Sequence, residues 1–172
     1  IMRKIIQSII LLISIPGYSQ NYKITYFKSS NGNLIENQEA ILVFSNETKT
    51  LISTEKIITK KAEFPFDQTL VSRDNGFYSQ ITNLNEKEII STKDSTSLKK
   101  QTFELLNETK KILGYNCKKA KTIINSNTIE FWYTEELKVK GAPAILGQNL
   151  GLVLEMVRNG NFVIAANKIE KI

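Results

Sequence analysis

An alternation of apolar and polar residues at every second position runs through most of the chain, and it constrains the fold more than any other feature. In residues 128–134, for example, Ile129, Phe131 and Tyr133 share one side of an extended segment, and Trp132 lies on the other. Period two is the pattern of a β-strand that buries one face. The chain is therefore predicted to bury its apolar side chains by pairing extended segments, not by bundling helices.

The same pattern recurs in further segments that turn residues separate. We predict strands over residues 22–26, 40–44, 50–53, 70–72, 77–81, 88–91, 103–105, 117–124, 128–134, 152–157 and 162–165. Asn159-Gly160 lies between two of these runs and predicts a tight hairpin, because both central residues of such a turn need a positive φ. The expected fold is mainly β: a single antiparallel, strongly twisted sheet or an open or partial barrel, with at most one short helix.

Three segments lack a clear strand pattern. Residues 92–100 are polar without an apolar period, which predicts a loop or a disordered lid. Asn107-Glu108-Thr109 has the composition of a turn. Residues 142–146, which include Pro143, are the one candidate for a short helical turn.

The N-terminus has the composition of a secretory signal. Met2-Arg3-Lys4 is positively charged, residues 5–15 are mostly apolar, and Gly17 and Ser19 are small residues in front of a cleavage point. A transmembrane helix needs about 20 apolar residues, so this run is too short to span a bilayer. We expect residues 1–19 to be a signal peptide and residues 20–172 to form one β-rich domain. The C-terminus stops inside a strand-like run, so the domain is expected to be either complete or clipped at this end.

The composition excludes several kinds of site. The chain has no histidine, which removes Ser-His-Asp and Cys-His pairs and histidine-ligated zinc. Only three of the 23 basic residues are arginine, the residue that phosphate and base recognition favour, so a nucleic-acid partner is not expected. We predict no cofactor, metal or catalytic residue. The single cysteine, Cys117, is expected to pack as a small apolar residue.

Two groups of side chains carry alternative interpretations. Trp132 and Tyr133 form either a stacking platform for a sugar or base or a part of the core. Glu130 and Glu155 are the best candidate pair of carboxylates for acid/base chemistry. The lysines at positions 118, 119 and 121 indicate a solvated surface or a contact with anionic groups.

Four short motifs resemble a known family. They are the segment from Lys111 to Ala120 (KILGYNCKKA), then Phe131-Trp132-Tyr133-Thr134, Gly141-Ala142-Pro143, and Gly151-Leu152-Val153-Leu154-Glu155. In order and spacing they resemble the GLPGLI family of exported Bacteroidetes proteins, although Gln148-Asn149-Leu150 stands where the proline-bearing half of the name-giving motif is expected. The resemblance implies an envelope-associated protein of unassigned activity without catalytic residues to carry over. The candidate binding or family-motif positions are Gly114, Tyr115, Cys117, Trp132, Tyr133, Gly151 and Glu155.

These observations lead to two hypotheses on function. The first is a non-enzymatic binding or structural module of the cell envelope, in the periplasm or at the outer membrane, that holds a lipid, lipoprotein or partner segment on an apolar sheet face. Its partners would be lipid or envelope protein, and no transmembrane helix would remain after the signal is cleaved. The alternative is a carboxylate-dependent envelope hydrolase that uses Glu130 and Glu155, which requires the two side chains to share one face.

Overall fold

A computed structural model describes residues 20–172, and the predicted signal peptide at residues 1–19 lies outside the described part. Twelve strands and one helical turn account for most of the described residues. The elements are β1 (Tyr22–Ser30), β2 (Asn33–Leu34), β3 (Ile41–Ser45), β4 (Lys49–Thr54), α1 (Glu55–Ile58), β5 (Phe66–Ser72), β6 (Phe77–Asn83), β7 (Ile89–Asp94), β8 (Glu104–Ile112), β9 (Tyr115–Ile124), β10 (Asn127–Thr134), β11 (Leu152–Arg158) and β12 (Phe162–Lys171).

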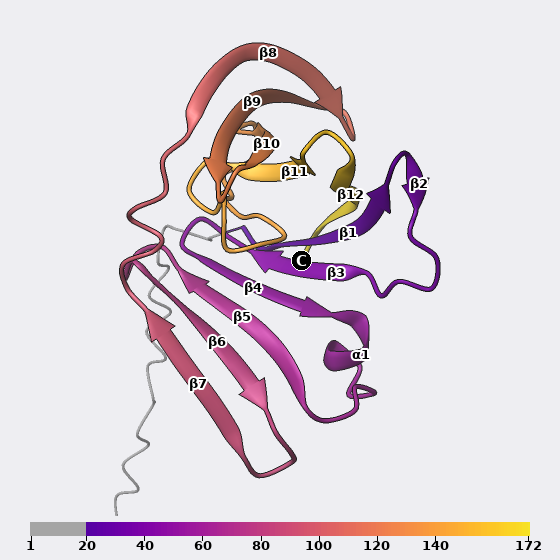
Figure 1. The fold of residues 1–172 in the computed structure, drawn as a ribbon. Helices are drawn as coiled ribbons and strands as arrows, with labels where there is room; N and C mark the ends of the chain where they lie inside the picture. Colours follow the sequence, from indigo (N-terminus) through magenta and orange to yellow (C-terminus); the bar gives the residue numbers. More distant parts are fainter. Residues whose placement is uncertain (1–19) are drawn as a thin grey trace, which may run out of the picture.

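All these strands belong to one antiparallel sheet, in the order β7-β6-β5-β4-β3-β1-β12-β11-β10-β9-β8, and β2 pairs with β1. The first and last long strands, β1 and β12, are therefore neighbours at the centre of the sheet. Figure 1 shows β3 to β7 fanning out below β1, whereas β8 to β12 curl above it. The prediction of a mainly β fold with a single twisted, open antiparallel sheet is confirmed.

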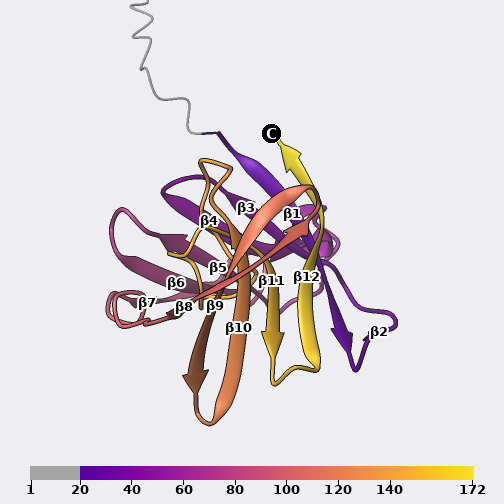
Figure 2. The same cartoon turned by 90° about the horizontal axis from the view of Figure 1, so that it is seen from above.

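Tight turns with positive φ connect the strands of the C-terminal half. Asn159 and Gly160, with φ of 50° and 73°, join β11 to β12, as the Asn-Gly pair predicted. Leu113 and Gly114 join β8 to β9 in the same way, with φ of 50° and 87°. Positive φ at both central residues matches the twist of paired strands, which explains why these hairpins are so short. Figure 2 shows the hairpins of β9–β10 and β11–β12 side by side.

Two clusters of buried side chains form the core. The larger cluster joins β1, β3, β9, β11 and β12, and its members include Ile24, Val43, Cys117 and Leu154. Inside it the Tyr26 hydroxyl donates a hydrogen bond of 2.7 Å to the carbonyl oxygen of Val153, so the one polar atom of this buried ring is satisfied. Burial raises the pKa of Tyr26, because the phenolate would lose its hydration.

The smaller cluster lies under the connection between β10 and β11. Its buried members are Ala120, Ile129, Phe131, Tyr133, Ala142 and Val153. The predicted alternation in residues 128–134 is confirmed, since Ile129, Phe131 and Tyr133 share this buried side. Leu146 and Leu150 of the connection pack on the cluster, so residues 135–151 cover this part of the sheet.

Arg73 fastens this connection to the N-terminal half of the sheet. Its guanidinium group donates hydrogen bonds to the Thr50 hydroxyl at 2.7 Å, to Gln148 Oε1 at 3.2 Å, and to the carbonyl oxygens of Glu47, Asn46 and Lys49. Gln148 is fully buried, and its amide nitrogen donates to carbonyl oxygens within the connection. Burial lowers the pKa of Arg73 to about 10, which leaves the group charged at neutral pH.

Three local predictions were wrong. Residues 142–146 form an irregular stretch of bends that leads into a turn, beside an isolated bridge at Gly141. The short helix is α1 instead, where Glu39 Oε1 accepts a hydrogen bond from the Lys56 backbone N–H. Residues 92–94 were expected in a loop but belong to β7. Pairing with β6 satisfies the hydrogen bonds of their backbone, whatever the polarity of their side chains. Asn107-Glu108-Thr109 lies inside β8, where a register shift against β9 absorbs the extra residues without a turn.

Candidate functional site

The register of the C-terminal strands gathers charged side chains around Trp132. Trp132 on β10 lies directly opposite Glu155 on β11 and Lys119 on β9. Glu130 precedes Trp132 by two positions and therefore shares its face. Lys110 reaches the same place from β8, where it lies opposite Cys117. We call Lys110, Lys119, Glu130, Trp132 and Glu155 the Trp132 cluster.

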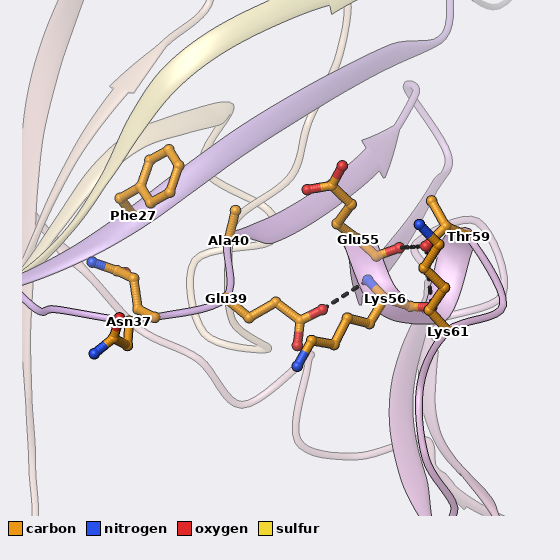
Figure 3. A pocket seen from close by; sticks show the side chains of 9 residues that line it. Phe27, Asn37, Glu39, Ala40, Glu55, Lys56, Thr59 and Lys61 are labelled. Atoms are coloured by element: carbon orange, nitrogen blue, oxygen red, sulfur yellow. Dashed lines mark hydrogen bonds between the residues drawn. The ribbon is translucent and has the colours of Figure 1, made fainter.

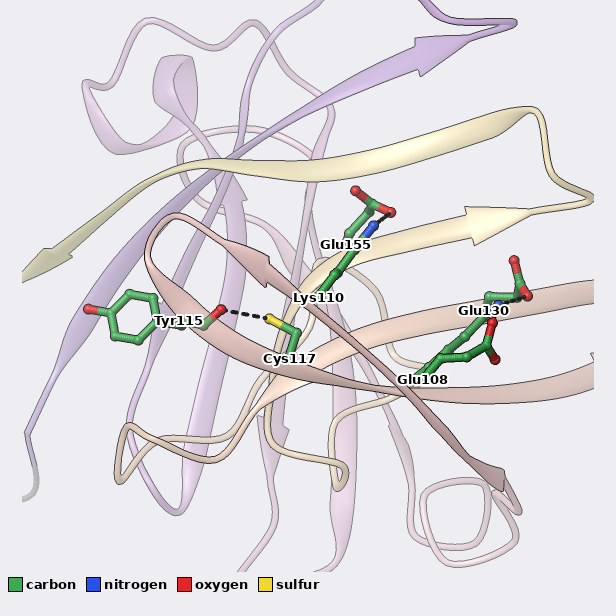
Figure 4. Close-up of polar contacts among 7 residues, drawn as sticks. Glu108, Lys110, Tyr115, Cys117, Glu130 and Glu155 are labelled. Atoms are coloured by element: carbon green, nitrogen blue, oxygen red, sulfur yellow. Dashed lines mark hydrogen bonds and ion pairs between the residues drawn. The ribbon is translucent and has the colours of Figure 1, made fainter.

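Each carboxylate of the Trp132 cluster is paired with an ammonium group. Lys110 Nζ lies 2.7 Å from Glu155 Oε1, and Lys119 Nζ lies 2.8 Å from Glu130 Oε1 and 3.2 Å from Glu108 Oε1. The hydrogen bond to Glu130 is the main reason why the pKa of Lys119 is raised. Figure 4 shows these groups pointing toward one another from separate strands.

The same two lysines cover the Trp132 ring. Nζ of Lys110 lies 4.4 Å from the ring centroid and Nζ of Lys119 lies 5.4 Å from it, which are cation–π distances. Trp132 also packs against the larger core cluster. A sugar could stack on this ring only after a lysine moved, so the structure favours charge contacts over stacking at this position.

The Glu130 and Glu155 side chains do share one face, which the hydrolase alternative required. They are diagonal neighbours across β10 and β11, for which separations of about 7–8 Å are typical, with Cβ atoms somewhat closer. A general acid, however, is made by a low-dielectric or like-charged environment that favours its neutral form. Glu130 and Glu155 instead each form an ion pair with a lysine ammonium group.

Tyr115 and Cys117 complete this face of β9, four and two positions from Lys119, respectively. Cys117 is fully buried in the larger core cluster, and its Sγ lies 3.7 Å from the carbonyl oxygen of Tyr115. Burial raises the pKa of the Cys117 thiol. The residue packs as a small apolar side chain.

Because burial shields the Cys117 thiol and disfavours its thiolate, we expect a thiol reagent such as DTNB to label the folded protein far more slowly than the urea-unfolded chain at pH 8. The release of thionitrobenzoate measures both rates, and free cysteine in the same urea solution corrects for the solvent. Equal rates for the folded and unfolded protein would mean that Cys117 is accessible and that its assigned packing is incorrect.

The remaining predicted positions lie outside the Trp132 cluster. Gly114 forms the β8–β9 turn. Tyr133 faces the smaller core cluster, on the opposite side of β10 from Trp132, and burial raises its pKa. Gly151 precedes β11 and packs against the backbone of β10. From the predicted set, the structure thus places Tyr115, Cys117, Trp132 and Glu155 on one face, with Gly114 in the turn beside Tyr115, whereas Tyr133 lies on the opposite face.

Replacing Gly151 by alanine is expected to lower the free energy of unfolding by about 1–3 kcal/mol, because overpacking forces the backbone apart. The added Cβ would lie 2.7 Å from the Thr134 carbonyl oxygen and 3.0 Å from Tyr133 Cδ2. Urea denaturation measures the change. Gly160→Ala is the control, because its Cβ would meet nothing within 4 Å and adds only the strain of a positive φ. A Gly151→Ala variant that is more stable than the control would contradict this packing.

The part of the chain that the structure describes holds no group of three or more Cys, Asp or Glu residues arranged to bind a metal ion. Within residues 20–172, no helix is long and apolar enough to cross a membrane. Lys119 belongs to the lysine group noted in the sequence, but the approach of Lys110 and Lys119 to Trp132 could not be predicted, because it depends on the register between β8, β9 and β10.

Comparison with known proteins identifies the family. The model of the family described as N-glycanase peptide, N-terminal domain, matches residues 24–172, which is nearly the whole described part. This chain belongs to that family. Two solved structures of PNGF-II, in space groups C2 and P21, are 53% identical to it and superpose with TM-scores of 0.85 and 0.86. No curated protein matches the chain.

This chain is much shorter than the PNGF-II chains that it matches. The match to PNGF-II covers 90% of this chain but only 28% and 29% of the two PNGF-II chains. The chain therefore spans less than a third of the solved relatives that it matches.

The family assignment overturns two predictions from the sequence. The resemblance to GLPGLI proteins was wrong, because its motif residues have structural roles that many antiparallel sheets share: Gly114 in a hairpin, Cys117 in the core and Gly151 at a close approach. The prediction of a non-enzymatic envelope module was also wrong, since the match points to an enzyme family. The predicted lipid or envelope-protein partner stays untested.

Proposed function

We propose that this chain is the N-terminal domain of an N-glycanase and takes part in releasing N-linked glycans from glycoproteins or glycopeptides. The observation that carries the proposal is the family match over residues 24–172, supported by 53% identity to PNGF-II over most of the chain. At that identity the fold superposes closely, so surface groups used for a shared activity can occupy equivalent places.

The geometry is consistent with a contribution to substrate recognition within such an enzyme. The Trp132 cluster presents ammonium and carboxylate groups on one sheet face, and both kinds of group form hydrogen bonds with sugar hydroxyls. Four of its five side chains come from regular strands that hydrogen bonds hold in register, which limits their freedom before a ligand arrives. The proposal assigns no catalytic residue to this cluster.

Export is the part of the predicted localisation that family membership supports. We extend it to the periplasm or the outer-membrane surface as the compartment in which the enzyme would meet glycosylated substrates. Fractionation of cells, with an antibody against residues 20–172, tests the compartment, and detection in the cytosolic fraction alone would contradict it.

A glycopeptide assay tests the proposed activity. The natural polypeptide that carries this chain is incubated with a synthetic peptide bearing one N-linked glycan, and the products are separated by mass spectrometry. Hydrolysis of the glycan–asparagine amide leaves aspartate on the peptide, whereas cleavage between sugars leaves the first sugar attached. We expect release of the glycan. A folded protein that leaves the glycopeptide intact would refute the proposal.

A further inference from the structure

Two hollows meet at Phe27, on the same sheet face as the Trp132 cluster. The first, of about 380 Å³, is lined by Phe27, by residues 37–40, by Glu55 and Lys56 of α1, by Thr59 at its C-terminal end, and by Lys61. The second, of about 270 Å³, is lined by Phe27, Lys28, Ala165, Asn167 and neighbouring residues of β1 and the β1–β2 turn. Figure 3 shows the Phe27 ring at one side of the first hollow, facing polar side chains from α1.

Hydrogen bonds hold the wall of the first hollow in place. Gln38 Oε1 accepts from the Lys28 backbone N–H at 2.6 Å, and Gln38 Nε2 donates to the carbonyl oxygens of Lys28 and Ile35. Glu39 Oε1 accepts from the Lys56 N–H at 2.7 Å, which ties the wall to α1. The first hollow is therefore formed before any ligand binds, and little ordering would oppose binding.

Several polar groups at the first hollow are available to a ligand. Within residues 20–172, the side chains of Glu55, Lys56 and Lys61 take part in no ion pair. The hollow thus offers a carboxylate, two ammonium groups, the Asn37 amide and one aromatic ring.

This mixture of charges selects the chemistry of the ligand. An anion would meet the carboxylates of Glu39 and Glu55, and a metal cation would meet the ammonium groups of Lys56 and Lys61. A lipid tail would desolvate all four charges. A neutral molecule rich in hydroxyl groups avoids these costs, because each hydroxyl both donates and accepts hydrogen bonds. Its C–H face can also pack on the ring of Phe27.

The register of the sheet places the hollows at Phe27 in one row with the Trp132 cluster. Phe27 lies opposite Ala165, Ala165 lies opposite Glu155, and Glu155 lies opposite Trp132. Residues opposite one another on paired strands point to the same face. The row crosses three strand spacings, or about 14 Å at about 4.8 Å for each spacing. Ala165 has a small side chain, so it does not project far from the sheet between Phe27 and Glu155.

We propose that the hollows at Phe27 form a saccharide-binding subsite that holds sugar residues of the glycan away from the cleaved bond. This inference rests on the proposed N-glycanase function and adds to it the place and the chemistry of recognition. Phe27 packs on a sugar ring, and Glu39, Glu55 and Lys56 bind its hydroxyl groups.

The test measures binding of a free N-glycan core pentasaccharide, made of three mannose and two N-acetylglucosamine units, by isothermal titration to the natural polypeptide. We expect Phe27→Ala to weaken binding at least about tenfold, as for other central contacts. The control is Phe77→Ala, which removes a ring on β6 that is already covered by Lys93 at 4.1 Å. Glu55→Gln is a second variant at an exposed helix position, where folding is not at risk, and it should weaken binding several-fold.

Thermal melts establish that each variant is folded, and the glycopeptide assay runs in parallel on the same samples. No binding by the wild type, or unchanged binding in both Phe27→Ala and Glu55→Gln, would overturn the subsite. Glycan release by the wild type in that case would leave the proposed function standing. A wild type that neither binds the pentasaccharide nor releases the glycan would reject the proposed function as well.

Discussion

Replacing Phe131 by alanine is expected to lower the free energy of unfolding by about 3–5 kcal/mol, the range for truncating a buried phenylalanine. Phe131 is fully buried and is the largest side chain of the smaller core cluster after Tyr133. Its ring contacts Phe103 edge to face, with 5.4 Å between the centroids. The connection between β10 and β11 lies on the same ring, since a Cβ on Gly147 would be 3.0 Å from it.

The cavity left by Phe131→Ala cannot close easily, because strands on one side and the connection on the other are both fixed by hydrogen bonds. Urea denaturation followed by circular dichroism gives the change in stability. Ile123→Ala is the matched control, because Ile123 is 67% exposed on the neighbouring β9 and should change stability little. Similar small losses for the two variants would show that Phe131 is not a core residue.

Replacing Arg73 by methionine is expected to lower the free energy of unfolding by about 3 kcal/mol. Hydrogen bonds from a charged group contribute about 1.5–3 kcal/mol, and their loss leaves buried acceptors without a donor. The acceptors left behind include Gln148 Oε1, the Thr50 hydroxyl and the carbonyl oxygen of Asn46. Methionine retains the apolar length of the side chain, so the variant isolates the polar contribution.

Arg73→Lys separates charge from geometry in the same measurement. Lysine retains the positive charge, but all its donors lie on one nitrogen atom, so it cannot reach Glu47, Thr50 and Gln148 at the same time. We expect the lysine variant to lose most of the same stability, and to show faster hydrogen exchange in residues 135–151. A lysine variant as stable as the wild type would mean that charge alone matters.

The strands could be predicted from the sequence where one face is buried and the other is exposed to solvent. Residues 128–134 alternate because Phe131 and Tyr133 enter a core that Trp132 does not. The pattern predicted the first half of β7 but failed for residues 92–94, because this strand is exposed along almost its whole length and carries no apolar period there. It failed again at Asn107-Glu108-Thr109, where turn-forming residues lie in an irregular stretch of β8.

The candidate site depended on contacts that no local pattern encodes. Period two places Glu130 and Trp132 on one face, but the approach of Glu155 and Lys119 requires the register of three strands. A register shift between Trp132 and Tyr133 also changes which residue of β11 lies opposite the ring. The partners of Arg73 lie 23 to 75 residues away along the chain, beyond the reach of local motifs.

A chimera tests most directly whether residues 20–172 serve as a domain of an N-glycanase. In PNGF-II, the segment that matches this chain is replaced by residues 20–172, and the rate of glycan release from a native glycoprotein is compared with that of PNGF-II and of PNGF-II without the segment. We expect the chimera to release the glycan nearly as fast as PNGF-II and faster than the truncated enzyme. A folded chimera no faster than the truncated enzyme, where truncation itself slows release, would contradict this role.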